Sequence, residues 1–245
     1  MPPRKRPGDR LADRLAHLEH RVAAACLRAG RARSEVTLIG VSKEQPEDLV
    51  REAIGLGLVD LGENRVQALE RRMDTFGEAS PELRWHLIGP VQTNKAKAVA
   101  RRRPSLLHTV DRIALIDALH KELSKVGGHL GALDVLVQVD IDDEPQKAGV
   151  AVAELMPLCE HLARTPTLTL RGLMAIPRPL DEVGEPALAR TFDKMARLTE
   201  TIAPLVASRG RPILSMGMSD DFELAIEHGA THIRVGSALF GPRPA

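Results

Sequence analysis

Apolar residues recur along the chain in two alternating patterns. Residues 11–26 carry an apolar residue at every third or fourth position, which is typical of one buried helix face. After Gly30 the pattern changes to short apolar runs of strand-like composition, each followed by a longer segment with helical spacing. This alternation predicts a parallel sheet whose strands are joined by helices.

Eight short runs are predicted to be strands: residues 36–41, 58–61, 84–88, 106–110, 135–139, 168–174, 212–215 and 232–235. The predicted helices that follow them are residues 46–56, 66–76, 94–102, 113–126, 152–164, 187–208 and 220–229. This arrangement in 245 residues fits an α/β fold with a single (β/α)8 TIM barrel, which typically has about 250 residues. An open, doubly wound parallel sheet is the alternative.

The two ends of the chain complete this organisation. Residues 237–241 are too few for a full outer helix after the last strand, so we expect the extra N-terminal helix, residues 10–28, to cover that side of the barrel. Residues 1–9 are basic and proline-rich, and we expect a mobile terminus ahead of one domain spanning residues 10–245. Residues 177–186, rich in Pro and Gly, are predicted to form a long loop, where active-site lids occur.

Composition narrows the class of protein. Hydrophobic residues make up 43% and charged residues 27%, as in folded globular domains. A net charge of +1 and the shortage of aromatic residues, with four Phe, one Trp and no Tyr, argue against a nucleic-acid partner. No run approaches the roughly 20 apolar residues of a membrane span. Cys26 and Cys159 lie in helical patterns as buried thiols rather than as a metal or disulfide pair, which fits a reducing cytoplasm.

Polar and small residues collect where the predicted strands end. In a (β/α)8 barrel the carboxyl ends of the strands form the face that carries the active site. Lys43 follows the almost wholly apolar first strand, a position that favours the neutral amine and its condensation with an aldehyde. A surface lysine at the start of a loop is the competing interpretation.

The ends of strands seven and eight are predicted to bind phosphate, as these loops commonly do in this fold. Ser219 precedes residues 220–223, whose acidic residues resemble a capping box, and Gly236 and Ser237 open a short terminal helix. The competing interpretations are a plain helix cap and an ordinary turn.

Two further residues have a functional and a structural interpretation. Arg234 is predicted to point toward the mouth of the barrel, where a pyridine nitrogen would serve as its acceptor; the alternative is a salt bridge with Glu63 or Asp140. His86, on the third strand, is more often a hydrogen-bonded core histidine than a catalyst.

Six stretches together resemble the pyridoxal phosphate homeostasis proteins, the YggS/PROSC family. They are VSK at 41–43, GENRVQ at 62–67, WHLIG at 85–89, QTNK at 92–95, LSMGMS at 214–219 and IRVGSALFG at 233–241. The resemblance extends from about residue 10 to residue 241. It implies a barrel like the N-terminal domain of alanine racemase, which is fold type III of the pyridoxal-phosphate proteins.

The resemblance also implies the site. Lys43 would hold pyridoxal 5'-phosphate (PLP) as an imine, or Schiff base, and Arg234 would face the pyridine nitrogen. A cationic neighbour disfavours protonation of that nitrogen and weakens the ring as an electron sink. The other implied cofactor-binding residues are Ser219, Gly236 and Ser237 around the phosphate, Asn64 and His86 around the ring, and Met216. A second lysine of the family falls at Lys147.

Three functions follow from these features. The resemblance implies a non-catalytic, monomeric PLP carrier that stores and buffers the cofactor and delivers it to apo-enzymes. A racemase or decarboxylase of the same fold would need an acid/base on the opposite face of the ring and usually a second domain; alanine racemase uses Tyr there, and this chain has none. A cofactor-free aldolase, whose lysine attacks a sugar phosphate directly, is the third.

Overall fold

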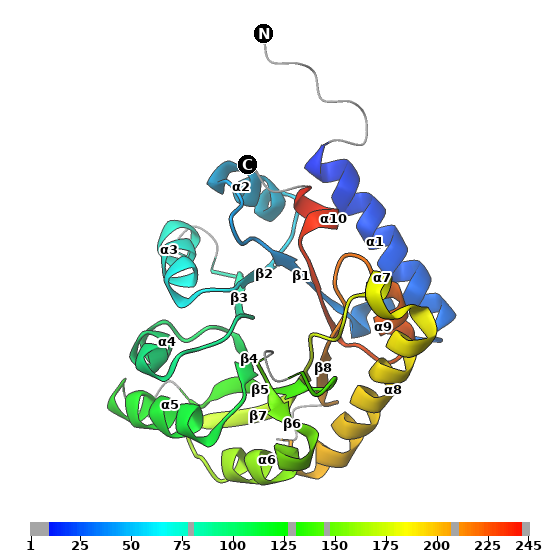
Figure 1. Cartoon of the computed structure of the whole chain (residues 1–245). Helices are drawn as coiled ribbons and strands as arrows, with labels where there is room; N and C mark the ends of the chain where they lie inside the picture. Colours follow the sequence, from blue (N-terminus) through cyan, green and yellow to red (C-terminus); the bar gives the residue numbers. More distant parts are fainter. Residues whose placement is uncertain (1–9, 78–80, 127–130, 145–147, 207–210, 242–245) are drawn as a thin grey trace.

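Parallel strands close into a barrel with helices around its outside (Figure 1). The structure, a computed structural model, describes residues 10–77, 81–126, 131–144, 148–206 and 211–241. The barrel strands follow the order β4-β3-β2-β1-β9-β8-β7-β5, and pairing of β4 with β5 closes the ring. The predicted (β/α)8 barrel is therefore confirmed, and the open sheet is excluded.

The strands are β1 (Thr37–Val41), β2 (Asp60–Glu63), β3 (Arg84–Leu87), β4 (Leu106–Val110), β5 (Leu133–Asp140), β6 (Val150–Ala151), β7 (Leu168–Met174), β8 (Ile213–Ser215) and β9 (His232–Val235). The helices are α1 (Leu11–Arg28), α2 (Glu47–Gly55), α3 (Val66–Phe76), α4 (Ala96–Arg102), α5 (Ile113–Val126), α6 (Leu155–Ala163), α7 (Leu180–Val183), α8 (Glu185–Ile202), α9 (Phe222–Glu227) and α10 (Ser237–Phe240). The short strand β6, which pairs with β5 outside the ring, was not predicted.

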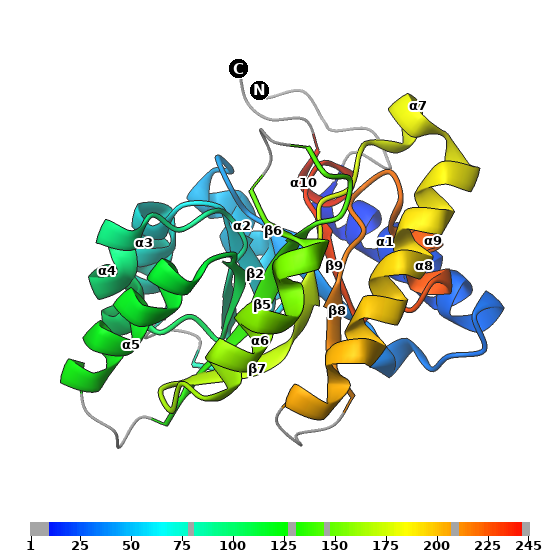
Figure 2. The ribbon, with the colours of Figure 1, turned by 60° about the horizontal axis from the view of Figure 1, so that its bottom comes forward.

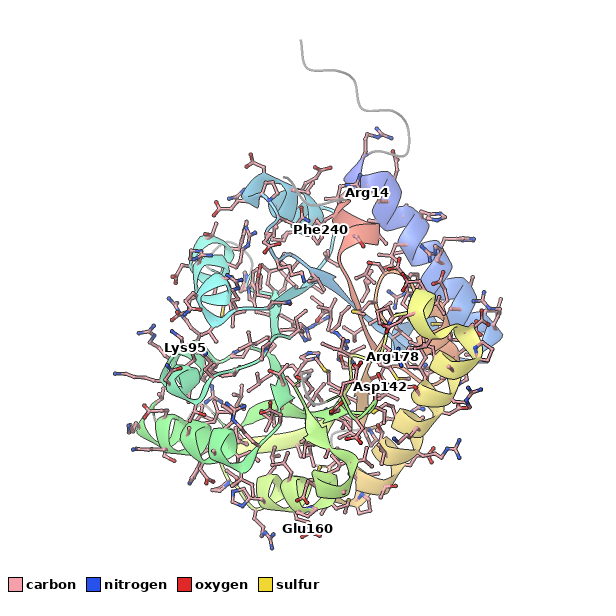
Figure 3. All side chains as sticks on the ribbon, in the orientation of Figure 1. Arg14, Lys95, Asp142, Glu160, Arg178 and Phe240 are labelled. Carbon is pink, nitrogen blue, oxygen red and sulfur yellow. The ribbon has the colours of Figure 1, made fainter. Side chains whose placement is uncertain are left out.

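Side chains alternate between the two faces of the barrel strands, as the pleat of a strand requires. Trp85 and Leu87 on β3 belong to the main apolar core, which joins strand and helix residues. His86, between them, is buried within the barrel and bonds to residues of the neighbouring strands. Figure 3 shows side chains filling the centre of the ring. The interior of the barrel is therefore a packed space that holds several polar groups.

Helix α1 covers the side of the barrel beside α9 and α10 (Figure 1). Arg14 donates hydrogen bonds to the carbonyl oxygens of Leu239 and Phe240 at 2.7 and 3.2 Å (Figure 3). Arg21 forms an ion pair with Glu223 on α9 at 2.6 Å. The expectation that residues 10–28 cover this side is confirmed.

Several predicted boundaries were wrong. Residues 177–186 are not a plain loop, because they contain the one-turn helix α7 and the start of α8, at the mouth of the barrel in Figure 2. The helix predicted to reach residue 208 ends at Ile202, where Pro204 lacks the N–H that would continue it. Strand β2 begins at Asp60, two residues later than predicted. Within the described residues, no helix combines the length and hydropathy needed to cross a bilayer.

Candidate functional site

A cavity of about 510 Å³ opens where the barrel strands end. Small-molecule sites typically occupy roughly 300–1,000 Å³, so the cavity has the size of a ligand site. Its lining residues are Val41, Lys43, Gln45, Asn64, Ile88, Ile176, Met218, Ser219, Asp220, Arg234, Gly236, Ser237 and Gly241. Six of the predicted site residues thus share one cavity: Lys43, Asn64, Ser219, Arg234, Gly236 and Ser237.

Lys43 lies in a tight turn directly after β1. The Gln45 N–H donates to the Ser42 carbonyl oxygen at 3.1 Å, and Glu44 adopts the left-handed conformation with φ of 61°. Arg72, on α3, donates to the carbonyl oxygens of Ser42, at 3.3 Å, and of Gln45. The backbone on both sides of Lys43 is therefore held by one guanidinium. The half-buried lysine is presented from a fixed turn rather than from a free loop.

Glu63 is the buried carboxyl group behind this turn. Ser42 Oγ donates to its Oε1 at 2.8 Å, and Arg72 pairs with the same oxygen at 3.3 Å. Burial raises the pKa of Glu63, while Ser42 and Arg72 oppose that rise. Since Glu63 pairs with Arg72, the alternative interpretation that it forms a salt bridge with Arg234 is wrong.

Arg234, on β9 beside β1, is a buried cation in the cavity wall, with 4% of its surface exposed. Its Nη1 donates to Ser215 Oγ at 2.8 Å and its Nη2 to the Ala175 carbonyl oxygen at 3.0 Å. Burial lowers the pKa of Arg234 to about 10, with Asp221 acting in the other direction, so the side chain stays charged at neutral pH. The two hydrogen bonds use two of five N–H groups, and both acceptors are uncharged.

The loops after β8 and β9 meet at Ser219. Its Oγ accepts a hydrogen bond from the Ala238 N–H at 3.3 Å, which joins the β8 loop to the first turn of α10. Ser237 begins α10, so its N–H has no acceptor within that helix. Hydroxyl groups of Ser219 and Ser237 and backbone N–H groups at Gly236 and Ser237 therefore border one corner of the cavity. Such groups suit an anion.

The predicted capping role of residues 220–223 was wrong. Helix α9 begins at Phe222, and its N-cap, Asp221, makes no side-chain capping bond. Asp221 instead accepts a hydrogen bond from the Met218 N–H, three residues before it in the chain. Ser219 therefore does not cap α9, and its hydroxyl group bonds to α10 instead.

Two predicted cofactor-binding residues, His86 and Met216, do not line the cavity. His86 lies deeper in the barrel, with Nδ1 3.0 Å from His108 Nε2 and Nε2 2.9 Å from Asp60 Oδ1. Met216 is fully buried in the main apolar core. Gly217, at φ of +93°, turns the chain so that Met218 lines the cavity instead. The geometry therefore does not support direct ligand contact by His86 or Met216.

Sequence reasoning missed the apolar part of the lining: Val41, Ile88, Ile176 and Met218. Ile88 had a usable signal, because it lies two residues beyond His86 and so on the same face of β3, nearer the mouth. Ile176 had none, since it follows β7 in an irregular segment. Lys147 lies outside the described residues.

Comparison with known proteins places the chain in a family. Residues 14–244 match the model of the alanine racemase N-terminal domain. The chain is 39% identical over 235 residues to the pyridoxal phosphate homeostasis protein of Escherichia coli K12, covering 95% of this chain and 97% of that one. It is 41% identical over 234 residues to the protein of the same name from Pseudomonas aeruginosa, covering 95% and 96%.

Solved structures agree with this placement. PipY of Synechococcus elongatus, solved with PLP bound, is 33% identical with a TM-score of 0.77, over 95% of this chain and all of that one. Alanine racemase of Corynebacterium glutamicum has a TM-score of 0.66 at 16% identity, over 94% of this chain and 62% of that one, which shows a shared fold. The chain belongs to the pyridoxal phosphate homeostasis proteins, within the alanine racemase N-terminal domain family.

Proposed function

We propose that this protein binds PLP reversibly as an imine on Lys43 and acts in PLP homeostasis as a carrier without turnover. The observation that carries the proposal is that one cavity is lined by an amine, two serines at a helix start, and a buried guanidinium: Lys43, Ser219, Ser237 and Arg234. These are the groups that an aldehyde, a phosphate and a pyridine nitrogen each require. The family relatives and PLP-bound PipY support the same ligand.

Lys43 supplies the covalent chemistry. Its neutral amine adds to the aldehyde carbon, a C=N bond forms, and one water molecule leaves; addition of water reverses the step and frees the aldehyde. The fixed turn from Ser42 to Gln45 holds the Lys43 backbone at the edge of the cavity, which lowers the entropy lost on binding. Reversal by water alone is what a carrier needs.

Arg234 favours carriage over catalysis. A guanidinium that remains charged next to the pyridine nitrogen disfavours protonation of that nitrogen, and the ring is then a weak electron sink. A racemase would also need a second acid/base, and the chain contains no Tyr for that role. The cofactor supplies carbanion stabilisation only where its ring can accept electrons, so we propose storage, buffering and delivery to apo-enzymes.

Location and assembly are part of the same proposal. The unpaired, buried Cys26 and Cys159 suit a reducing compartment, and we propose the cytoplasm. The large exposed apolar side chains among the described residues are few and far apart in the sequence, and the two on α5 lie at its opposite ends: Leu27, Leu56, Ile113, Val126 and Ile176. Scattered single residues do not form an interface, which supports a monomer.

Absorbance titration with PLP tests the proposal. The wild-type protein is expected to develop a visible band that Lys43→Ala lacks, while Lys125→Ala, which removes an exposed lysine on α5, keeps it. The loaded protein should then activate an apo PLP enzyme and show no racemisation or decarboxylation of amino acids. An unchanged band in Lys43→Ala, or steady turnover of an amino acid, would contradict the proposal.

A further inference from the structure

A chain of hydrogen bonds crosses the interior of the barrel from Arg234 to the opposite end. Arg234 Nη1 lies 2.8 Å from Ser215 Oγ, and Ser215 Oγ lies 3.0 Å from His108 Nδ1. His108 Nε2 lies 3.0 Å from His86 Nδ1, and His86 Nε2 lies 2.9 Å from Asp60 Oδ1. Besides Arg234 on β9, the strands β8, β4, β3 and β2 thus contribute one residue each. Of these five residues, only Arg234 lines the cavity at the mouth.

The two ends of the chain fix its direction. A guanidinium only donates hydrogen bonds, so Ser215 Oγ accepts one from Arg234. A carboxylate only accepts them, so His86 Nε2 carries a proton and donates to Asp60. With both histidines neutral, His86 Nδ1 must accept from His108 Nε2–H. His108 Nδ1 is then bare and accepts the hydroxyl proton of Ser215. Every link donates away from Arg234.

The charges around this chain of hydrogen bonds fit its direction. Asp60 already has a cationic partner, because Arg84 donates to both of its carboxylate oxygens, at 2.7 and 2.5 Å. Burial is the main cause that lowers the pKa of His108, and the charge of Arg234 acts in the same direction. A second cation inside the barrel would face Arg234 without a counter-ion. The neutral arrangement places no uncompensated charge there.

We propose that Ser215, His108, His86 and Asp60 are positioning residues that orient Arg234 toward the ligand. The inference rests on the proposed function, since the ligand group that Arg234 meets is the pyridine nitrogen. Arg234 has no carboxylate partner among the hydrogen bonds described, and its Nη1 is held by Ser215 alone. Each group in this chain of hydrogen bonds accepts a hydrogen bond from the neighbour that is nearer to Arg234. The anchor is Asp60, which does not line the mouth of the barrel.

The chain explains why His86 is polar and buried without touching the cavity. It also relates the two ends of the barrel, because Asp60 and Arg84 line a separate cavity of about 540 Å³ beside α1 and α2. A change at Asp60 is therefore expected to alter the surroundings of a ligand that Asp60 does not contact.

Imidazole ¹⁵N NMR of the cofactor-free protein at pH 7 tests the arrangement directly. His86 and His108 should each carry one ring proton, on Nε2, in the wild-type protein. A doubly protonated His86, or a proton on Nδ1 of either ring in the wild-type protein, would overturn the proposal. This measurement needs no cofactor and no variant that might fold poorly.

The absorption spectrum of the PLP-loaded protein tests the effect on Arg234. Ser215→Ala and Asp60→Ala should each change the ratio of near-ultraviolet to visible absorbance at least twofold. Thr199→Val, which removes a buried hydroxyl on α8, should not. Unchanged ratios in Ser215→Ala and Asp60→Ala would refute the positioning role, whereas absence of PLP binding by the wild-type protein would refute the proposed function instead.

Discussion

Arg14 Nε donates to the carbonyl oxygen of Leu239 at 2.7 Å, so the first helix of the chain holds the last one in place. The same guanidinium reaches the Phe240 carbonyl oxygen at 3.2 Å. These two carbonyl groups belong to α10, whose first turn borders the cavity at Ser237. An element far from the site in sequence thus supports the corner where we propose that phosphate binds.

Removing this contact should destabilise the protein. Arg14→Ala leaves partly buried carbonyl groups without their donor, which costs about 1–3 kcal/mol. Urea unfolding should show a free energy of unfolding lower by that amount. Arg28→Ala is the matched control, because Arg28 forms an exposed ion pair with Glu227 that is worth about 1 kcal/mol or less. Equal losses in the two variants would contradict the supporting role of Arg14.

The proposed phosphate corner predicts selective loss of affinity. Ser219→Ala and Ser237→Ala each remove a hydroxyl near the site, and a hydrogen bond to a charged group contributes about 1.5–3 kcal/mol, or roughly tenfold or more in Kd. Affinity for PLP should fall accordingly, while affinity for pyridoxal, which lacks the phosphate, should not change. Ser124→Ala, at an exposed position on α5, is the control. Parallel losses for both ligands would show that the serines act on the fold and not on phosphate.

Buried histidines make stability depend on pH. Burial lowers the pKa of His232 to about 3, from an ordinary value of about 6.5. Between these values the unfolded chain binds a proton at His232 that the folded protein does not, so the free energy of unfolding falls as pH decreases through this window. The expected slope is about 1.4 kcal/mol per pH unit from this residue. Asp60, whose pKa is lowered from 3.8 to about 2, contributes only below about pH 4, which is lower than the pH range measured.

Urea unfolding at pH 7, 6 and 5 measures the slope. His232→Gln should reduce the loss of unfolding free energy between pH 7 and 5 by about 2 kcal/mol, whereas His20→Gln, at an exposed position on α1, should leave this loss unchanged. An identical slope in wild-type protein and His232→Gln would mean that His232 is protonated in the folded state.

Gly89 links the end of β3 to the cavity wall. A Cβ at this position would lie 1.9 Å from the backbone oxygen of Asn64, so Gly89→Ala must displace the backbone of a lining residue. We expect a loss of several kcal/mol in unfolding free energy, in line with overpacking of a rigid site. Gly55→Ala on α2 meets no atom within 4 Å and should stabilise the protein by about 0.5–1 kcal/mol. Equal stability of the two variants would contradict this geometry.

The sequence predicted the barrel because its signals are local. Each strand and helix carries its own apolar periodicity, and the closing pair β4–β5 follows once eight strands alternate with helices. Helix ends were less certain, since the stop at Ile202 depends on Pro204 within a segment that otherwise keeps helical spacing.

The site was partly predictable for a similar reason. Lys43, Arg234 and Ser237 could be placed because strand ends meet at one face of the barrel. The sequence did not show how deep in the barrel a side chain lies. His86 points into the barrel, in line with the alternation along its strand, but it lies below the cavity, and Ile88 lines the cavity instead. For Met216, the turn at Gly217 decides which neighbour faces inward.

Borohydride reduction followed by peptide mapping tests the central claim most directly. The protein is incubated with PLP, reduced, digested and analysed by mass spectrometry. The account predicts one phosphopyridoxyl group per chain, attached to the Lys43 side chain, and no stable label in Lys43→Arg. A label on a different lysine, or an unlabelled wild-type protein, would contradict it.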